Sequence, residues 1–315
     1  MVGTSGELLT VPEEERRVSE DDRLDPATEA FVAHRNLLFT VAYEMLGSVA
    51  DAEDVLQETW LRWAAVDLTT VRHKRAYLVR IATRQALGRL RTLGRRKESY
   101  VGPWLPEPLL TAPDVAEDVE LAESVSMAML LVLETLSPTE RAVFVLREVF
   151  DIGYDEIAEA VSKTPTAVRQ IAHRARAHVA SRRPREAASR AETLAALQAF
   201  RGAVETGDLQ SLLDVLAPDV VLLSDGGGVR RTVLQPVVGS SKVARLLEAG
   251  LNKVGTVMSV EPVHVNGGPA LVVRLDGKID SVLTMRVDHG LVTGLYFVRN
   301  PEKLARMDRQ RAVNR

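Results

Sequence analysis

Apolar residues recur at helical spacing through the first third of the chain, from about Pro26 to Lys97. A break at Gly47 and Ser48 interrupts the series. The pattern predicts an all-α bundle over residues 26–98, and the polar, charged residues 1–25 before it predict a disordered arm. The apolar positions expected to form the core of the bundle are Phe31, Leu37, Leu38, Val41, Met45, Val55, Leu61, Leu78, Ile81, Ala82, Leu87 and Leu90.

The pattern stops at residues 99–126, where breakers of regular structure accumulate. Pro103, Pro106, Pro108 and Pro113 lie close together there with Gly102. This is too many helix breakers for a packed element, so the stretch predicts an acidic, proline-rich linker. Its Trp104 is a candidate anchor.

A second helical block is predicted over residues 127–185. Ser137 followed by Pro138 and Glu140 is the signature of a helix start with a capping box. A short helix over Tyr154–Val161 follows, then a turn at 162–163, and Thr164 caps another helix that Pro165 opens. Two helices joined by so short a turn predict a helix-turn-helix.

The last of these helices has two distinct sides. Val168, Ile171, Ala172, Ala175 and Val179 form an apolar stripe, and the other side carries Arg169, Gln170, His173, Arg174 and Arg176. Arg and Gln side chains on an exposed helix match guanine and adenine edges in the major groove, at about 1–3 kcal/mol of discrimination each. The alternative for this helix alone is a basic amphipathic helix that lies on a bundle with one solvated face.

The hydrophobic period changes again after the helix-turn-helix. One amphipathic helix over Thr193–Glu205 is followed by alternating runs rich in Val and Leu. Turn signals at residues 225–228, 266–268 and 276–277 separate these runs. Residues 190–306 therefore predict an α+β domain with a mostly antiparallel sheet, which makes the chain a multidomain protein of two all-α domains and one α+β domain.

The charges are segregated along the chain although the net charge is only −3. Residues 72–97 hold ten Lys and Arg and no acidic residue, and residues 163–190 hold eight against one Glu. Residues 98–140 between them carry nine acidic residues and no Lys or Arg. The two basic blocks predict surfaces for nucleic acid phosphates. A separate acidic cluster at Asp51, Glu53, Asp54 and Glu58 requires a different partner.

The composition excludes several other classes of protein. With no cysteine, the chain has no disulfide framework or thiolate metal site, and its six histidines show no ligand spacing. We therefore expect no metal and no cofactor. No apolar run reaches the roughly 18 residues that a membrane span needs, so we expect a cytoplasmic protein without a membrane partner.

The helix-turn-helix resembles region 4 of sigma factors, the part that reads the −35 promoter element. The N-terminal block resembles region 2: residues 51–63 look like the segment that docks on RNA polymerase, and residues 75–91 look like the −10 reader. The chain is thus similar to extracytoplasmic-function sigma factors. The resemblance implies core RNA polymerase and promoter DNA as partners and promoter-directed transcription initiation as the function.

The resemblance also implies roles for single residues. Asp51, Asp54, Gln57 and Glu58 would contact polymerase, Tyr77, Arg80, Arg84 and Gln85 would contact the −10 strand, and the five basic-side residues of the last helix would read −35 DNA. Basic and aromatic groups on a rigid helix can hold unpaired bases by phosphate contact and stacking. Arg84 and Gly88 stand where the family commonly has Asn and Asp.

The C-terminal part resembles a SnoaL-like domain, a cone-shaped fold of one curved sheet with helices over a face. Three motifs are similar to those of the sigma-J-type subfamily with this extension. Val229 stands where that subfamily has Lys. The resemblance implies that the linker motif packs on the C-terminal domain and that the domain regulates the chain in cis. The docking residues are Trp104, Leu105, Pro106, Glu107 and Pro108, then Asp225, Gly226, Gly227 and Gly228, and then Asn300, Pro301 and Lys303.

Two alternatives stay open at this point. The cone pocket of an enzyme of this fold could use Asp225, Asp280, Asp288 or His289 as a general acid or base, but nothing in the sequence brings two of them together. A one-component helix-turn-helix repressor with a ligand-binding domain would leave the first hundred residues unexplained. We expect no enzyme, a small-molecule ligand of the C-terminal domain as a further partner, and a monomer when free.

Overall fold

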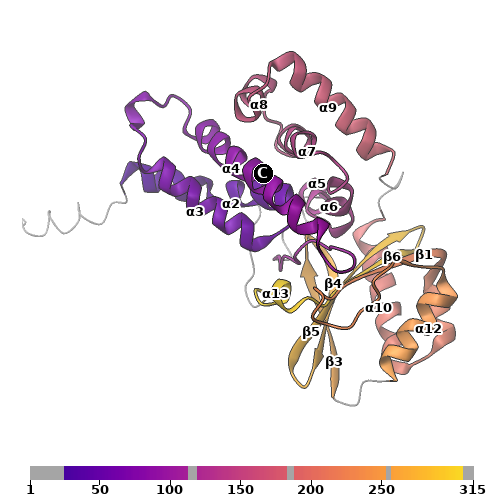
Figure 1. Ribbon diagram of the computed structural model, residues 1–315. Helices are drawn as coiled ribbons and strands as arrows, with labels where there is room; N and C mark the ends of the chain where they lie inside the picture. The colour runs from indigo at the N-terminus through magenta and orange to yellow at the C-terminus, as the bar shows by residue number, and fades with distance from the viewer. Residues whose placement is uncertain (1–24, 113–118, 183–187, 253–256, 308–315) are drawn as a thin grey trace, which may run out of the picture.

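The computed structural model describes residues 25–112, 119–182, 188–252 and 257–307 (Figure 1). The predicted arm over residues 1–25 falls almost wholly outside this range. The described chain runs through helices first and the sheet afterwards. The helical elements before the sheet domain are α2 (Pro26–Leu46), α3 (Val49–Trp63), the 3₁₀ turn η1 (Leu68–Thr70), α4 (Lys74–Glu98), α5 (Val119–Ser124), α6 (Met127–Leu133), α7 (Pro138–Phe144), the π-helical turn η3 (Val145–Val149), α8 (Tyr154–Val161) and α9 (Pro165–Ala180).

Helices α2–α4 form the N-terminal bundle. The predicted break is confirmed: Gly47 ends α2 with a left-handed φ of 66°, and the Ser48 hydroxyl accepts a hydrogen bond from the Asp51 amide as the cap of α3. The prediction that Leu61 belongs to the core was wrong, because 63% of this residue is exposed. The buried stripe of α3 runs through Val55, Thr59 and Trp63 at helical spacing, and residue 61 lies off it.

Helices α6–α9 form the helix-turn-helix unit. The capping box at Ser137 and Glu140 is confirmed, and so is the cap of α9 by Thr164 with Pro165 in the first turn. Ser162 ends α8 in the left-handed conformation, with φ of 56°, at a turn where glycine is more usual. The predicted apolar stripe of α9 is buried throughout, so the polar side of this helix faces outward.

The N-terminal bundle and the helix-turn-helix unit share one hydrophobic core. Leu38 of α2 and Leu78 of α4 belong to the same cluster of buried side chains as Leu146 of η3, Ile157 of α8 and Val168 of α9. Two segments that the sequence predicts as separate domains are therefore packed together, and Figure 1 shows α4 alongside α7 and α8.

The C-terminal domain has the predicted α+β class. Its strands lie in the order β2-β1-β6-β5-β4-β3, and all pairs are antiparallel except β1 with β6. Together with the all-α segments before it, this confirms the predicted fold class. The elements are α10 (Arg190–Thr206), α11 (Leu209–Val215), β1 (Leu216–Asp225), β2 (Val237–Val238), α12 (Ser240–Leu251), β3 (Met258–Val265), β4 (Gly268–Leu275), β5 (Lys278–Asp288), β6 (Leu291–Val298) and α13 (Pro301–Leu304).

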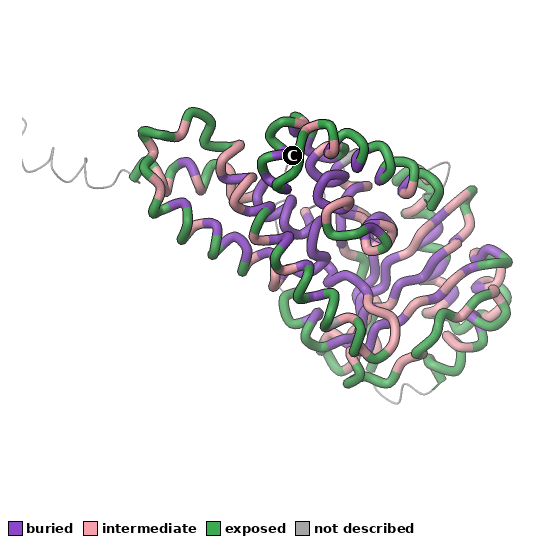
Figure 2. The backbone as a smooth tube through the Cα atoms, turned by 45° about the horizontal axis from the view of Figure 1, so that its top comes forward, coloured by how far each residue is buried: buried purple, intermediate pink, exposed green. Residues whose placement is uncertain are grey.

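Both faces of this sheet are covered. Leu271, Leu283 and Leu295 on one face pack against helices α10–α12. On the other face, Val272 and Val282 belong to a cluster that contains side chains of the linker and of α6. Figure 2 shows buried residues on both sides of the junction between the helical part and the sheet. The sheet therefore joins its own helices to the rest of the chain.

The linker is packed along residues 105–111, which corrects the expectation that its prolines prevent packing; residues 113–118 lie outside the described range. Leu105 and Leu109 are 0% and 1% exposed, and Leu110 forms an antiparallel bridge with Val265 at the end of β3. Proline removes a backbone donor, so an irregular segment rich in proline has fewer amides to satisfy when it is buried. Among the described residues of this stretch, α5 is the one helix.

Within the described residues, no helix is both long and apolar enough to cross a membrane. The same residues contain no group of three or more His, Cys, Asp or Glu side chains that could hold a metal ion.

A buried ionic network lies where α2, α4, α5 and α7 meet. The carboxyl group of Glu44 is fully buried and accepts a hydrogen bond of 2.8 Å from the Ser124 hydroxyl. Arg141 donates to the Glu44 carbonyl oxygen at 2.9 Å and to Glu134 at 2.7 Å, and Lys97 pairs with Glu134. Burial raises the pKa of Glu44 to about 8, more than the Ser124 hydrogen bond and the Arg141 charge lower it.

We expect Glu44→Gln to flatten the pH dependence of stability. A carboxyl group with a raised pKa in the folded state favours folding while protonated, so the wild type loses stability as pH rises from about 4.5 to about 8. The amide of the variant cannot ionise, and its free energy of unfolding should exceed that of the wild type increasingly across this window. Urea unfolding at several pH values measures the difference. Glu29→Gln on the exposed side of α2 is the control, and parallel curves for wild type and Glu44→Gln would contradict the assignment.

Candidate nucleic-acid interface

The polar side of α9 is open to solvent. All the predicted −35 residues, Arg169, Gln170, His173, Arg174 and Arg176, are exposed. Arg176 contacts Glu148 at 3.4 Å, and the Arg169 guanidinium lies 5.4 Å from the centre of the Tyr154 ring. Neither contact buries the end of the side chain, so this surface is free to meet a DNA groove.

The predicted −10 face of α4 is contacted by α8 through Arg80 and Arg84. Arg80 forms an ion pair of 2.8 Å with the Glu159 carboxylate and lies 4.5 Å over the Tyr77 ring. The Arg84 guanidinium donates to the Glu159 carbonyl oxygen at 2.8 Å. Gln85 lies on the other side, beside Glu58 of α3. Two of the four predicted −10 residues are therefore bonded to the helix-turn-helix unit.

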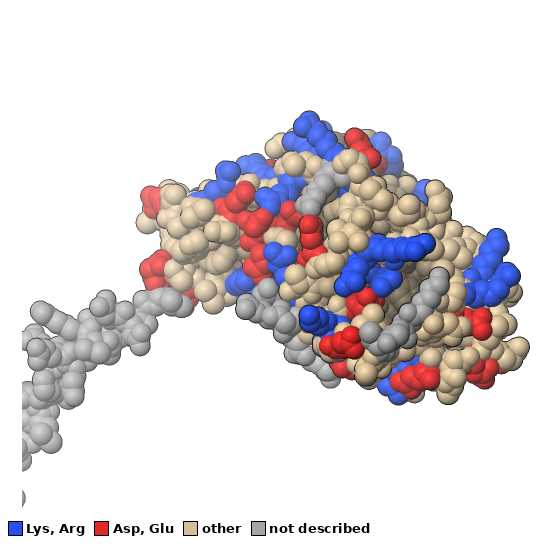
Figure 3. All heavy atoms as spheres, turned by 60° about the horizontal axis from the view of Figure 1, so that its bottom comes forward, with Lys and Arg blue, Asp and Glu red and all other residues tan. Residues whose placement is uncertain are grey.

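The acidic cluster on α3 is paired within the bundle. Arg89 of α4 bonds Asp51 at 2.8 Å, contacts Asp54, and lies 3.8 Å from Glu58. Gln57 is exposed beside them. On the face shown in Figure 3, acidic and basic side chains lie side by side over the N-terminal bundle. The predicted polymerase-binding residues thus form one surface whose charge Arg89 partly neutralises.

The predicted docking motifs of the linker and the C-terminal domain meet at the Asp225 carboxylate, which is 1% exposed. It accepts hydrogen bonds from the Tyr100 hydroxyl at 2.5 Å, the Leu105 amide at 3.0 Å and the Lys303 ammonium at 2.7 Å. Asn300 in turn donates to the Tyr100 hydroxyl at 2.9 Å. We call these five residues the Asp225 cluster.

Lys303 completes the cluster from α13. Its ammonium group donates to the Leu105 carbonyl oxygen at 2.5 Å and lies 3.6 Å from the centre of the Trp104 ring. Burial lowers the pKa of Lys303, although the Asp225 carboxylate favours its charged form. One carboxylate oxygen, one carbonyl oxygen and the rings of Trp104 and Tyr100 thus surround a cation that has little contact with water.

The glycines after Asp225 allow the chain to turn close to α13. Gly227 and Gly228 have φ of 67° and 73°, and a Cβ atom on Gly227 would lie 2.6 Å from the Asn300 side chain. The carbonyl oxygen of Gly226 accepts from the Arg230 amide at 2.9 Å and closes the turn. Val229 is exposed and makes no charge contact; the cation bonded to Asp225 is Lys303 from α13. Asn300 caps α13, which Pro301 opens.

Glu107 attaches the linker to α3. Its buried carboxylate accepts from the Val49 amide at 2.8 Å and from the Ser48 hydroxyl at 3.2 Å, at the start of that helix. The Tyr43 hydroxyl donates to the Glu107 carbonyl oxygen at 2.7 Å. Burial raises the pKa of Glu107. Pro106 and Pro108, on either side, are buried as well.

The turn between β3 and β4 forms another attachment. The Asn266 amide group donates to the Tyr43 hydroxyl at 2.6 Å and to the Val125 carbonyl oxygen at 2.9 Å, and it accepts from the Leu109 amide at 3.1 Å. Gly267 follows with φ of 71°, and a Cβ atom there would lie 2.6 Å from the Ala122 backbone. The C-terminal domain is therefore hydrogen-bonded to the bundle, to the linker and to the residue that follows α5 through one side chain.

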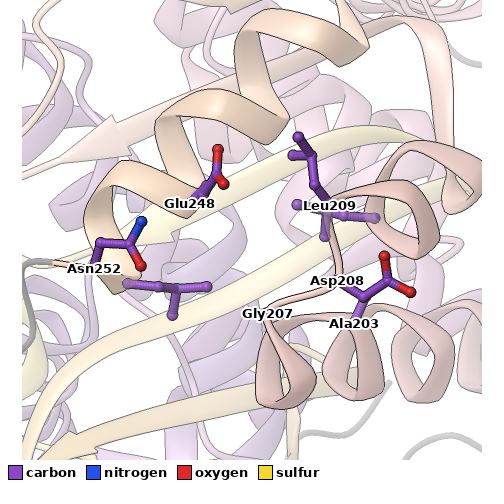
Figure 4. A pocket seen from close by; sticks show the side chains of 8 residues that line it. Ala203, Gly207, Asp208, Leu209, Glu248 and Asn252 are labelled. Atoms are coloured by element: carbon purple, nitrogen blue, oxygen red, sulfur yellow. The ribbon is translucent and has the colours of Figure 1, made fainter.

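The candidate acid and base residues of the enzyme alternative have other partners or lie apart. Asp225 belongs to the cluster above, and Asp280 forms a bidentate pair with Arg299 at 2.9 and 3.1 Å. Asp288 ends β5 half-buried, and His289 is exposed in the turn that follows. A shallow cavity of about 60 Å³ between α10, α11 and α12 is lined by Asp208, Glu248 and Asn252 (Figure 4). This volume is too small for an organic substrate.

Comparison with known families matches both helical parts of the chain. Residues 30–96 match the family model of sigma-70 region 2, and residues 126–179 match that of sigma-70 region 4. The first match covers the N-terminal bundle, and the second covers the helix-turn-helix unit.

Whole proteins match over nearly the full length. The chain is 34% identical over 295 residues to the ECF RNA polymerase sigma factor SigJ of Mycobacterium tuberculosis, covering 87% of this chain and 91% of that protein. The chain belongs to the ECF RNA polymerase sigma factor family. It is also 30% identical to the probable ECF sigma factor SigI of the same species, over 89% of this chain and 95% of the relative.

The sigma factor shares its whole architecture with a solved relative. The crystal structure of M. tuberculosis SigJ superposes with a TM-score of 0.70 at 31% identity, covering 87% of this chain and 96% of that one. Alternative sigma factors direct RNA polymerase to promoters, so the chain functions in transcription initiation with polymerase and promoter DNA as partners. This assignment decides against the repressor alternative, and the relatives are initiation factors, not enzymes.

The sequence analysis did not predict several residues that make contacts between the parts of the sigma factor. Glu159 and Arg89 are charged residues on exposed helix faces, and no sequence signal distinguishes them from solvated ones. Tyr43 and Glu44 could have been found from the sequence: their hydroxyl and carboxyl groups lie inside the apolar run 37–46, and buried polar groups need hydrogen-bond partners. Asn266 was identified only as a turn residue.

We expect Asp225→Asn to destabilise the sigma factor by about 3–5 kcal/mol, the usual effect of removing one partner of a buried ion pair. The amide would leave the Lys303 ammonium without its anion. Urea unfolding of the full chain measures the loss. Asp219→Asn, an exposed position on the same strand, is the control. Equal stabilities of the two variants would contradict a structural role of the Asp225 cluster.

Proposed function

We propose that the C-terminal domain regulates this sigma factor in cis by holding regions 2 and 4 in a docked arrangement that cannot span a promoter. The observation that carries the proposal is the ion pair of 2.8 Å between Arg80 of the −10 face and Glu159 of the helix-turn-helix unit.

The distance between promoter elements supports this proposal. The −10 and −35 elements are centred about 25 base pairs apart, which is roughly 85 Å of duplex at about 3.4 Å per base pair. In the docked arrangement, region 2 and region 4 share a hydrophobic core. Both elements cannot be read at once from this arrangement, and the gain from simultaneous binding is lost.

The C-terminal domain supplies the contacts that maintain docking. The Asp225 cluster fixes the linker to the sheet, Glu107 fixes it to α3, and Asn266 bonds both the linker and α2. A linker held at three points cannot extend to separate the two DNA-reading regions. Release of the C-terminal domain would free it.

We assign the predicted contact residues to the released state. Arg169, Gln170, His173, Arg174 and Arg176 read the −35 element. Tyr77, Arg80, Arg84 and Gln85 contact the −10 strand, and Asp51, Asp54, Gln57 and Glu58 bind polymerase. Within the described part of the chain, the −35 set is exposed and unbonded to region 2 even when docked, whereas the guanidinium groups of Arg80 and Arg84 are bonded to Glu159 and would be released when α8 moves away.

We expect Glu159→Gln to raise transcription by core polymerase plus the full chain. Loss of a largely exposed ion pair weakens docking by about 0.2–1 kcal/mol, which increases the released fraction up to about fivefold. Glu156→Gln, on the exposed side of the same helix, is the control.

A second measurement follows opening directly. The chain has no cysteine, so Leu61→Cys on α3 and Lys163→Cys in the helix-turn-helix turn can carry a donor and an acceptor dye. Energy transfer between the two dyes should be lower in the Glu159→Gln variant than in the wild type, and it should fall further when core polymerase is added. Unchanged transfer in the variant and with polymerase would contradict a docked inactive state, while absence of any polymerase-dependent transcription would contradict the function itself.

A separate expectation concerns −35 reading. Replacing Gln170 by Ala should relax discrimination at one base pair of the −35 element by about 1–3 kcal/mol. Transcription from a library of −35 sequences measures this, with Gln198→Ala on α10 as the control. Loss of transcription from all promoters alike would instead indicate a general defect in DNA binding.

A further inference from the structure

A large cavity lies at the boundary between the C-terminal domain and the helix-turn-helix unit. Its volume is about 510 Å³, within the range of about 300–1,000 Å³ that holds organic ligands. The walls come from α5 and α6, from the start of α10, and from β4, β5 and the turn before β4. It is distinct from the cavity of about 60 Å³ between α10, α11 and α12.

The cavity walls are mostly apolar. Met127, Met129 and Val132 line it from α6, and Val265 and Met285 line it from the sheet. Methionine side chains adapt to irregular apolar shapes, so such walls accept a flexible or bulky hydrocarbon body. Thr284, 6% exposed, also lines the cavity, and within the described residues its hydroxyl has no hydrogen-bond partner.

The cavity also carries excess positive charge. Arg182, Arg190 and Arg286 line it, against the single carboxylate of Glu123. In the part of the chain that the structure describes, none of these three arginines pairs with a carboxylate: Arg286 bonds the Thr293 hydroxyl, and Arg190 contacts the His264 ring at 3.3 Å. Burial, and the charge of Arg190, lower the pKa of His264.

We propose that this cavity binds an amphipathic organic anion, an apolar body that ends in a carboxylate. The hydrocarbon part would lie against the methionines and valines, and the carboxylate would face Arg190 and Arg286. A neutral molecule of the same shape would gain the apolar contacts but leave the arginines with solvent alone.

Because the walls belong to two parts of the chain, such a ligand binds the docked arrangement more tightly than the released one. A ligand shifts an equilibrium only by its difference in affinity for the two states, and separation of α6 from the sheet would remove the walls that α5 and α6 supply. The ligand would therefore hold the sigma factor docked. This consequence rests on the proposed cis regulation, but binding itself does not.

Equilibrium dialysis of the full chain with radiolabelled dodecanoate, below its micelle concentration, tests the site. We expect dodecanoate to bind at least tenfold more tightly than dodecanol. Arg190→Gln should weaken dodecanoate binding about fivefold, the upper end for a pair in contact with solvent, and should leave dodecanol binding unchanged. Arg286→Gln should act in the same direction. Arg245→Gln, on the exposed side of α12 and outside the cavity, is the matched control.

Equal binding of dodecanoate and dodecanol, or equal losses in Arg190→Gln and Arg245→Gln, would overturn the proposed site. Transcription distinguishes the two proposals. Dodecanoate should reduce transcription by the wild type and affect Arg190→Gln less. If dodecanoate binds in a charge-dependent way but does not change transcription, the anion site stands and the proposal that the docked arrangement is inactive is wrong.

Discussion

The docked arrangement depends on one buried carboxylate. Asp225 carries its charge almost without water, so it must be surrounded by donors, and those donors come from the linker and from α13. The path of the linker is fixed by this requirement, because the Leu105 amide and carbonyl both bond within the cluster. Glu107, two residues further, then reaches the start of α3, and the bundle is joined to the sheet.

The contacts between the parts of the chain differ in strength. Those of the linker with the C-terminal domain are buried and charge-assisted, whereas the ion pair of Arg80 with Glu159 is partly exposed, with 29% and 65% of the two side chains accessible. Buried pairs are costly to break, and exposed pairs contribute about 0.2–1 kcal/mol. Region 4 is held to region 2 by this exposed pair together with the shared hydrophobic core and the buried hydrogen bond from Arg141 to the Glu44 carbonyl oxygen.

The local structure was predictable and the packing between parts was not. The capping residues Ser137 and Thr164 and the break at Gly47 act over a few residues, so the sequence shows them directly. The apolar stripe of α9 follows from helical period alone. In contrast, Asn266 looks like an ordinary turn residue, and its bonds to residues 43 and 125 depend on how the sheet meets the bundle. The proline content of the linker led to the wrong prediction that it is unpacked, because prolines indicate an irregular backbone and do not determine burial.

The members of the Asp225 cluster are synthesised at different times. Leu105 and Lys303 are 198 residues apart, and at about 5–20 residues per second a ribosome needs roughly 10–40 s to make the stretch between them. The bundle and the helix-turn-helix unit leave the ribosome during that time without the residue that completes the cluster. A newly made molecule therefore passes through an unrestrained stage that a mature one reaches only by undocking. In the proposed regulation, fresh synthesis would therefore be a source of sigma factor that has not yet been restrained.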